Sequence, residues 1–413
     1  MADIRTFRAV RPAKGMEDII AALPYDVYNR KEAVEVVKKN PNSFLAIDRA
    51  ETSFDDSVDT YDECVYQKAN DLLRDRIQKG DFIVEDMPMY YLYALTMNGR
   101  TQHGFVACAS IDDYDHQVIK KHENTRADKE LDRIHHVDTC SMQTGPIFLA
   151  YRQVPVLKQV MKQVIAESPL YDFTSEDGIR HRVWQIGDQD RQMAIKDAFE
   201  KMQAIYIADG HHRCASAVKV GKMRRQQYPG YTGEEEFNYF LSVLFPEEEL
   251  FIMDYNRVLK QLNGHTEEEF LSLLEQDFQV QLTGKEQVKP EQKGVFGLYL
   301  GKKWYKLTAK QHCFSEDPVK NLDVSILQDR VLQPIFAIED PKTDRRIDFV
   351  GGIRGLQELE RRCDVDCVAA FSMFPTDIKE LFDVADAGLL MPPKSTWFEP
   401  KLRSGLFLHE IER

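Results

Sequence analysis

The sequence lacks the short motifs that mark the commonest nucleotide, protease and hydrolase sites. Its 413 residues contain no Gly-x-x-x-x-Gly-Lys-[Ser/Thr] phosphate loop and no Gly-x-Gly-x-x-Gly turn after an expected strand. His-Glu-x-x-His and Gly-x-Ser-x-Gly are missing as well. These absences argue against a P-loop nucleotidase, a Rossmann dehydrogenase, a zinc protease of that type and an α/β-hydrolase.

Cysteine pairs are also missing. The seven cysteines include no Cys-x-x-Cys pair, and Cys363 and Cys367 have no second pair to complete a zinc site. Free thiols are typical of a reducing cytoplasm. Residues 1–7 show no apolar signal core, and no run approaches the roughly 18 apolar residues of a membrane span. We therefore expect a cytoplasmic protein without a membrane segment.

The sequence also lacks an excess of basic residues. Lysine and arginine number 54 against 68 aspartates and glutamates, which gives a net charge of −14. Nucleic acid and anionic lipid both bind basic surfaces, so the charge argues against either as a general partner. Small molecules are the expected partners, and the oligomeric state, monomer or homodimer, is left open.

The order of expected elements favours the α+β class, with mixed and antiparallel sheets and packed helices. Helices and strands alternate without a regular β-α-β rhythm, and 413 residues exceed what one core usually holds. We expect an N-terminal region over 1–87, a catalytic core over 88–250 and an additional α+β C-terminal domain over 251–413.

Local signals place several elements. Asn29 is expected to cap a helix over 30–39. Asn98-Gly99 between two apolar runs predicts a β-hairpin. The apolar run 44–47 predicts a short strand.

The most informative stretch is residues 203–219. Apolar residues 204–208 predict a buried strand, Asp209-Gly210 breaks it, and the small residues that follow predict a helix packed close against a sheet. The first turn of that helix would carry His211-His212-Arg213, where free N–H groups and the helix dipole attract anions. Arginine can clamp a phosphate through two hydrogen bonds. The pattern predicts a phosphate cradle, and the alternative is a surface basic cluster on a turn.

A second polar cluster precedes the first in the chain. Thr125 with Asp128 three residues later is a capping-box pattern, so a helix is expected from Arg126. His122-Glu123-Asn124 would lie in the loop that enters the positive end of this helix. A carboxylate beside an amide suits either a Mg²⁺ site or a general base next to a group that orients the substrate. The alternative is a solvated helix cap.

Together the two clusters supply the cations, N–H donors and carboxylates that phosphoryl transfer requires. Other polar residues are interpreted in two ways. Asp26 is either a further carboxylate near the site or an ordinary turn residue, and His135-His136 is interpreted as structural. Lys394 and Lys401 are either anion contacts or solvated lysines.

Motifs in order along nearly the whole chain resemble the family catalogued as domain of unknown function 1015. They are Phe7-Arg-Ala-Val-Arg-Pro12, Pro24-Tyr-Asp-Val27, Asn40-Pro-Asn-Ser-Phe-Leu45, Lys121-His-Glu-Asn-Thr125, Ala208-Asp-Gly-His-His-Arg213 and Met391-Pro-Pro-Lys-Ser-Thr396. The Asp-Gly-His-His-Arg segment also resembles the phosphate-binding turn of the ParB/sulfiredoxin superfamily, which implies a ParB/sulfiredoxin-like catalytic core. That superfamily includes free-serine kinases, CTP-binding partition proteins and sulfiredoxins.

The resemblance to the free-serine kinases implies a kinase that converts L-serine to O-phosphoserine with Mg²⁺ and ATP, ADP or pyrophosphate. The implied phosphate and nucleotide contacts are Gly210, His211, His212, Arg213, Asn124 and Arg126. The implied catalytic residues are Glu123 as base, Asp209 and His122. Asp26 and Thr125 are expected substrate contacts, and Glu123 and Asp209 the expected metal ligands.

Two other functions stay open. A nucleotide-binding or DNA-associated regulator is the first, although partition proteins carry Glu-Asn-x-x-Arg after the Gly-x-x-Arg turn and here His122-Glu-Asn-x-Arg126 precedes it. A nucleotide hydrolase, with water as acceptor, is the second. A sulfiredoxin needs a cysteine directly before the His-Arg of the turn, where this chain has His211.

Overall fold

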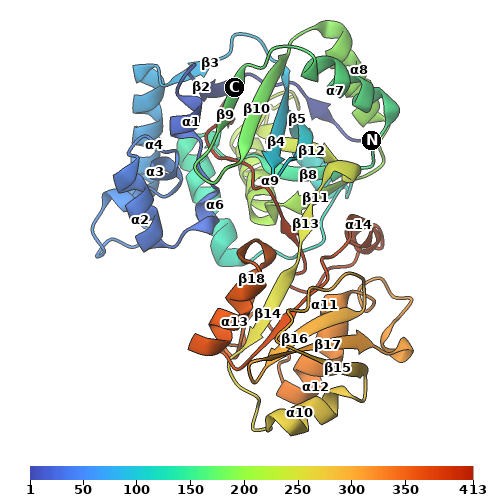
Figure 1. Cartoon of the computed structure of the whole chain (residues 1–413). Helices are drawn as coiled ribbons and strands as arrows, with labels where there is room; N and C mark the ends of the chain where they lie inside the picture. The colour runs from blue at the N-terminus through green and yellow to red at the C-terminus, as the bar shows by residue number, and fades with distance from the viewer. Residues whose placement is uncertain (413) are drawn as a thin grey trace. The chain divides into compact units, whose positions relative to one another are not determined.

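The computed structural model describes residues 1–412, which form two compact units (Figure 1). The first unit contains residues 1–250 and the segment from Pro400 onward, and the second runs from Phe251 to Glu399. The expected boundary between residues 87 and 88 falls inside the first unit. Both units combine helices with mixed or antiparallel sheets, which confirms the predicted α+β class.

A nine-stranded mixed sheet forms the centre of the first unit. Its path is β6 (Ile119–Lys120), β11 (Ile205–Asp209), β8 (Ile147–Tyr151), β12 (Tyr239–Pro246), β5 (Arg100–Ser110), β4 (Tyr90–Met97), β10 (Arg180–Ile186) and β9 (Tyr171–Thr174), with β1 (Ile4–Arg5) beside β5. The pairs β6–β11 and β8–β12 are parallel, and the others are antiparallel.

The hairpin β4–β5 forms where the sequence predicted it. Asn98 and Gly99 have φ values of 50° and 79°, the left-handed conformations that a tight two-residue turn requires, and Met97 pairs with Arg100. Tyrosine, leucine and alanine fill the buried part of β4, so the hairpin is anchored in the middle of the sheet.

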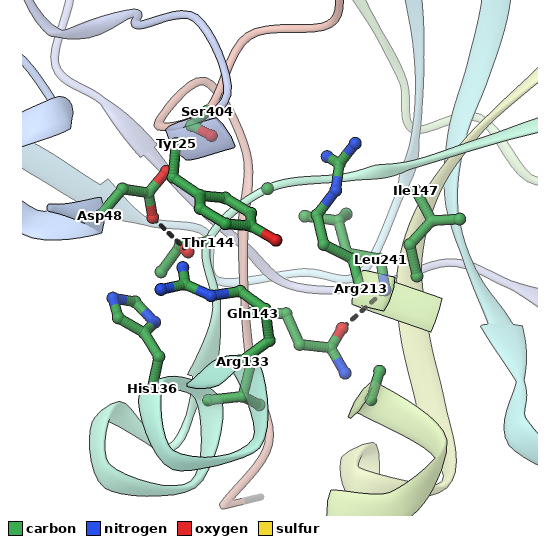
Figure 2. A pocket seen from close by; sticks show the side chains of 13 residues that line it. Tyr25, Asp48, Arg133, His136, Gln143, Thr144, Ile147, Arg213, Leu241 and Ser404 are labelled. Carbon is green, nitrogen blue, oxygen red and sulfur yellow. Dashed lines mark hydrogen bonds between the residues drawn. The ribbon is translucent and has the colours of Figure 1, made fainter. Parts of the chain in front are cut away.

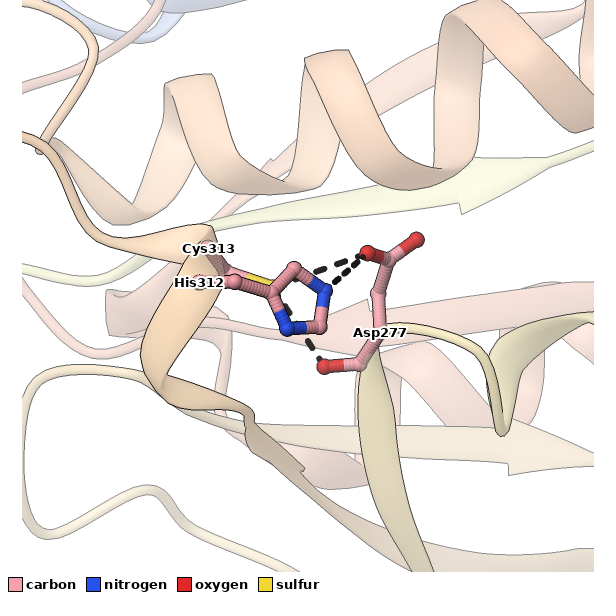
Figure 3. Close-up of side chains that lie close together, drawn as sticks. All are labelled: Asp277, His312 and Cys313. Carbon is pink, nitrogen blue, oxygen red and sulfur yellow. Dashed lines mark hydrogen bonds and ion pairs between the residues drawn. The ribbon is translucent and has the colours of Figure 1, made fainter.

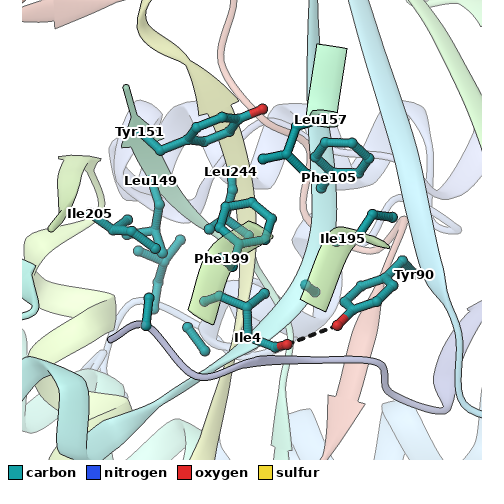
Figure 4. Packing of buried hydrophobic residues seen from close by; sticks show 14 of the residues in the cluster. Ile4, Tyr90, Phe105, Leu149, Tyr151, Leu157, Ile195, Phe199, Ile205 and Leu244 are labelled. Carbon is teal, nitrogen blue, oxygen red and sulfur yellow. Dashed lines mark hydrogen bonds between the residues drawn. The ribbon is translucent and has the colours of Figure 1, made fainter. Parts of the chain in front are cut away.

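The helices of the first unit are α1 (Glu17–Ile20), α2 (Arg30–Lys39), α3 (Leu45–Asp48), α4 (Glu63–Lys79), α5 (Ile111–Asp115), α6 (Ala127–Cys140), α7 (Pro155–Ile165), α8 (Gln189–Glu200) and α9 (His211–Gln227). The main core lies where α7 and α8 pack on the sheet (Figure 4). The Phe199 ring of α8 meets Phe105 and Tyr151 edge-on, with ring centroids 6.3 and 5.2 Å away. Each fully buried leucine or phenylalanine contributes about 1.5–3 kcal/mol to stability.

Helix α9 lies close to its neighbours because its inner face is made of small residues. Ala215, Ser216, Ala217 and Gly221 are buried. A Cβ atom on Gly221 would lie 2.4 Å from the carbonyl oxygen of Phe237, so a larger residue there would push the helix outward. This close packing fixes where the first turn of α9 stands.

A smaller layer contains α2, α3, α4 and a four-stranded sheet. The strands, in order, are β3 (Phe82–Val84), β2 (Ala9–Pro12), β21 (Leu408–Glu410) and β7 (Met142–Gln143). Because β21 pairs with both β2 and β7, the final segment of the chain is part of the first unit. Helix α2 begins at its predicted residue, and Asn29 and Glu32 form a capping box there.

The strand predicted over 44–47 is wrong, because Leu45–Asp48 form helix α3. The N–H groups of Ile47 and Asp48 return to the carbonyl oxygen of Phe44, 2.9 and 3.1 Å away. All four residues of α3 are buried, and a short apolar run that is buried on every side has no periodicity that separates strand from helix.

The second unit has a six-stranded antiparallel sheet in the order β15 (Phe278–Gly284), β17 (Lys303–Ala309), β16 (Val295–Leu300), β19 (Ala369–Ser372), β14 (Tyr255–Leu259) and β18 (Ile347–Gly351). Its other elements are β13 (Ile252–Met253), β20 (Trp397–Phe398), α10 (Glu267–Leu274), α11 (Asp323–Leu327), α12 (Gln333–Phe336), α13 (Leu356–Val365) and α14 (Ile378–Asp386). Among residues 1–412, no helix combines the length and apolar character that a membrane span needs.

Candidate functional site

Strand β11 passes into helix α9 through a single glycine. Gly210 has φ of 91°, in the left-handed region, and stands at the N-cap without a side-chain capping bond. A Cβ atom at this position would lie 3.0 Å from Nη2 of Arg213. Glycine is therefore needed both for the turn and for the Arg213 guanidinium, which lies across it.

Strand β6 lies beside β11 and runs parallel to it, with Ile119 opposite Ile205. Each strand is followed by a helix, α6 after β6 and α9 after β11. Because the carboxyl ends of parallel strands lie at the same edge of a sheet, the N-terminal ends of both helices gather there. The positive ends of two helix dipoles thus meet at the loop 121–126 and the turn at Gly210.

Two histidines of α9 hold the loop 121–126 in place. The backbone N–H of His122 donates to Nε2 of His211 at 3.4 Å, and that of Arg126 donates to Nε2 of His212 at 3.0 Å. The rings of His122 and His211 meet edge-on at 4.5 Å. The structure therefore joins the two clusters that the sequence singled out, although 86 residues separate Arg126 from His212.

His122 and His211 are both buried, and both are neutral at physiological pH. Burial lowers the pKa of His122 to about 4 and lowers that of His211 well below its ordinary value. Nδ1 of His122 is buried and has no hydrogen-bond partner in the described structure. The phosphate contacts of His211 and His212 stay predictions, and the Nε2 atoms of both histidines accept hydrogen bonds from the loop.

The predicted capping box at Thr125 is wrong. Helix α6 begins at Ala127, its N-cap is Arg126, and no side chain caps it. The Thr125 hydroxyl lies one residue before the N-cap and instead donates to the carboxylate Oε2 of Glu130 at 2.8 Å, a charge-assisted hydrogen bond. Arg126 pairs with Asp128 at 2.7 Å and is exposed.

Asp209 carries a negative charge that two cations stabilise. Its Oδ1 accepts the N–H of Gly210 at 2.8 Å, and its Oδ2 lies 2.9 Å from Nζ of Lys401. Burial alone would raise the pKa of Asp209, but Lys401 and Arg213 together hold it well below its usual range. Nη1 of Arg213 donates to the carbonyl oxygen of Pro146 at 2.6 Å, which aims the guanidinium across the turn.

The remaining predicted residues lie in two places. Glu123 is half-buried and Asn124 exposed, both in the loop between β6 and α6. Asp26 is exposed and lies on the one-turn helix η1 (Tyr25–Val27), where it lines a separate pocket. The structure thus brings Glu123 and Asp209 to one edge of the sheet and leaves Asp26 at the neighbouring pocket.

Two pockets adjoin this edge, and sequence reasoning missed most of their residues. A small pocket of about 30 Å³ has Tyr25, Arg133 and Arg213 in its wall (Figure 2). A larger pocket of about 160 Å³ lies beside it and shares Tyr25, Asp48, Arg133 and His136 with it. In the sequence, the one sign of these pockets was the pair of charged residues Asp48 and Arg49, which directly follows an apolar run.

A further cluster of ligand-type side chains lies in the second unit. Nε2 of His312 lies 2.8 Å from Oδ1 of Asp277, and the Cys313 thiol donates to the backbone carbonyl of Asp277 at 3.4 Å (Figure 3). Arg330 lies 3.8 Å from the same carboxylate oxygen, and burial raises the pKa of Cys313. The carboxylate is therefore already paired with a cation, and the cluster is accounted for by these mutual contacts.

A family model described as "Protein of unknown function (DUF1015)" matches residues 4–325. No curated protein matches this chain. A free serine kinase in complex with AMP superposes with a TM-score of 0.35 at 15% identity, over 73% of this chain and 91% of that chain.

Two further solved structures show a similar degree of likeness. A conserved hypothetical protein from Pyrococcus furiosus has a TM-score of 0.35 at 15% identity, over 74% of this chain and 95% of that chain. C-terminally truncated SbnI from Staphylococcus aureus has a TM-score of 0.38 at 10% identity, over 74% of this chain and 87% of that chain. These scores describe distant likenesses, and the chemistry of the site rests on the residues of this chain.

Proposed function

The chain belongs to the DUF1015 family, and we propose that it is a small-molecule kinase that transfers a phosphoryl group from a phosphoanhydride donor to free L-serine. The donor is ATP, ADP or pyrophosphate. The choice of L-serine comes from the resemblance of Asp209-Gly-His-His-Arg213 to the free-serine kinases; the choice of phosphoryl transfer comes from the site itself.

One observation carries the proposal. The loop 121–126 and the turn at Gly210 are hydrogen-bonded to each other at the start of two helices. Arg213 and Lys401 add two cationic side chains to the N–H groups there, and both influence the charge of Asp209. An edge that gathers two helix N-termini and two cations favours a ligand with several negative charges, such as a di- or triphosphate.

In the proposed reaction the hydroxyl oxygen of L-serine attacks the terminal phosphorus of the donor, and a new P–O bond forms. The bond to the leaving group breaks, so ATP leaves as ADP, ADP as AMP and pyrophosphate as phosphate. Glu123 accepts the proton of the hydroxyl group, which makes it the general base. Arg213 stabilises the charge that develops on the phosphoryl oxygens.

Magnesium fits the donor set of this site. Mg²⁺ is usually held by one or two carboxylates together with phosphate oxygens and water. Asp209 stays ionised at neutral pH, and with Glu123 it would supply the protein ligands, although its Oδ1 already accepts the N–H of Gly210 and its Oδ2 pairs with Lys401. When bound, the ion would neutralise part of the charge on the donor phosphates.

A donor screen tests the proposal. Purified protein with Mg²⁺ and L-serine is incubated separately with ATP, ADP, CTP and pyrophosphate, and O-phosphoserine is measured by mass spectrometry. We expect phosphoserine with at least one of ATP, ADP and pyrophosphate. Phosphate release that does not depend on serine would identify a nucleotide hydrolase, and no product with any donor would contradict the proposal.

A further inference from the structure

We infer that the larger of the two pockets, bounded by Tyr25, Asp48 and Arg133, binds the amino-acid group of the acceptor. The carboxylate of that group would bind at Arg133 and its ammonium at Asp48. Calling the ligand an acceptor rests on the proposed function; the binding of a small zwitterion does not. These residues lie outside both polar motifs, in the N-terminal layer and on helix α6.

The pocket is small, enclosed by polar groups and partly aromatic. Its volume of about 160 Å³ lies below the roughly 300–1,000 Å³ of pockets that hold drug-sized ligands, so it suits a small metabolite. Four tyrosines contribute to its wall, namely Tyr25, Tyr28, Tyr61 and Tyr66. Carboxylates and guanidinium groups both face it, which favours a ligand that carries charges of both signs.

Arg133 offers a cationic donor to this space. The side chain is 7% exposed, and its guanidinium carbon lies 3.9 Å from the centre of the Tyr25 ring. Its Nε and Nη2 reach Oδ2 of Asp132 at 3.0 and 2.9 Å. Nη1 has no hydrogen bond to any described residue, so one donor of a buried, positively charged group remains for a carboxylate.

Asp48 offers the complementary acceptor. It is 3% exposed, and its Oδ1 accepts a hydrogen bond from the Thr144 hydroxyl at 2.9 Å. No described group donates to its Oδ2, and the Tyr25 hydroxyl likewise has no protein partner among residues 1–412. None of these three atoms is among the enclosed polar atoms of residues 1–412 that lack a partner, so each faces the open space of the pocket, where a ligand can reach it.

A second arginine fixes the wall of the pocket. Arg49 bonds Glu51 at 2.5 Å and donates to the backbone carbonyls of Tyr25 and Tyr28 at 3.0 and 2.6 Å. Glu51 is 2% exposed. This network holds the turn η1 in place, so the Tyr25 ring is positioned before any ligand arrives.

The pocket shares lining residues with the smaller pocket, which reaches the turn that carries Arg213. Tyr25 and Arg133 line both pockets, and Arg213 lines the smaller one (Figure 2). On α6, Lys129, Arg133 and His136 face the pockets, and the same helix begins at the loop that carries Glu123. A zwitterion anchored at Arg133 and Asp48 would therefore extend its hydroxyl group toward Arg213.

Direct binding of L-serine, measured by calorimetry on the full chain without a donor, tests the inference. L-serine methyl ester lacks the carboxylate, and L-glycerate, which has the same configuration as L-serine, carries a hydroxyl in place of the ammonium group. We expect each to bind about tenfold or more weakly than L-serine, because each leaves one charged partner unpaired. We expect the same loss for L-serine with Asp48→Asn and with Arg133→Lys.

Matched variants separate the pocket from general stability. Arg11→Lys is the control for Arg133→Lys, because Arg11 is 8% exposed, pairs with Glu85 at 2.6 Å and lies over Tyr171, away from both pockets. Asp113→Asn, at a residue 7% exposed, is the control for Asp48→Asn. Tyr25→Phe keeps the ring beneath Arg133 and serves if either buried charge proves essential for folding.

The outcomes separate the inference from the proposed function. Serine binding that depends on Asp48 and Arg133, without phosphoserine formation, would support the pocket and contradict the kinase. Phosphoserine formation with serine affinity unchanged in folded Asp48→Asn, Arg133→Lys and Tyr25→Phe would support the kinase and overturn the pocket. Absence of serine binding to the wild-type chain at millimolar concentration would also overturn it.

Discussion

The ammonium group of Lys401 lies 2.9 Å from the carboxylate of Asp209, although 192 positions separate the two residues. The contact forms because the segment after Pro400 returns to the first unit, where β21 pairs with β2 and β7. It places a cation from the end of the chain beside the turn between β11 and α9. The site is therefore built from three distant parts of the sequence.

Lys401→Met is expected to weaken donor binding and to destabilise the first unit. The variant leaves Asp209 ionised without its nearest cation, which costs about 1–3 kcal/mol of unfolding free energy. Loss of one phosphate contact should raise the Kd for ADP by about tenfold or more. Chemical denaturation and calorimetry measure the two effects.

The double variant Lys401→Met/Asp209→Asn separates them. Neutralising Asp209 removes the unpaired charge, so the unfolding free energy should recover while ADP binding stays weak. Equal ADP affinity in wild type and Lys401→Met would show that Lys401 does not contact the donor.

Arg213→Lys is expected to lower kcat/KM by about a hundredfold while leaving the fold intact. Lysine keeps the positive charge but loses the planar fork that can hold two phosphate oxygens and the carbonyl of Pro146. Arg225→Lys, on the same helix and paired with Asp112, is the matched control and should retain activity. Near-normal turnover in Arg213→Lys would show that the guanidinium does not act on the phosphoryl group.

His212→Ala is expected to loosen the loop 121–126 without unfolding the protein. The imidazole accepts the N–H of Arg126 at 3.0 Å, and its removal leaves that donor without this partner. Hydrogen exchange of a peptide over 121–127 should become faster, while exchange in β4 and β5 stays unchanged. His212→Asn, which keeps a side-chain acceptor, should restore part of the protection; unchanged exchange in both variants would contradict the tie between the loops.

Stability is expected to fall in mildly acidic solution, partly through His122. In the unfolded chain a histidine binds a proton below about pH 6.5, whereas burial lowers the pKa of His122 to about 4 in the fold. The unfolded state therefore gains a proton between these values, so this part of the stability is present above pH 6.5 and is lost as pH falls toward 4.

The variant His122→Asn isolates that contribution. Between pH 6.5 and 5 the wild type should lose about 1.6 kcal/mol more than the variant, measured by urea unfolding at each pH. Parallel pH profiles for the two proteins would show that His122 is not buried in its neutral form.

Local signals predicted much of the fold, and long-range pairing decided the rest. Asn29 and the Asn98-Gly99 turn carry their own geometry in side-chain capping and positive φ, so α2 and the β4–β5 hairpin were found. Leu45–Asp48 have no such signal, because the segment is buried on every side.

The two polar clusters were visible in the sequence, but their meeting was not. It depends on the parallel pairing of β6, which is two residues long, with β11. The pairing of Lys401 with Asp209 depends in turn on where the last strand docks. Asp48 and Arg133 had no motif at all, since their common pocket comes from packing between α3, η1 and α6.

The most direct test is single-turnover transfer of label from ATP, ADP and pyrophosphate, each labelled on its terminal phosphate, with wild type and Glu123→Gln compared in the presence of Mg²⁺ and L-serine. We predict that wild type moves the label from at least one of these donors to O-phosphoserine, and that Glu123→Gln still binds that donor but transfers none. Equal transfer by Glu123→Gln, or label released as phosphate at the same rate with and without serine, would contradict the account.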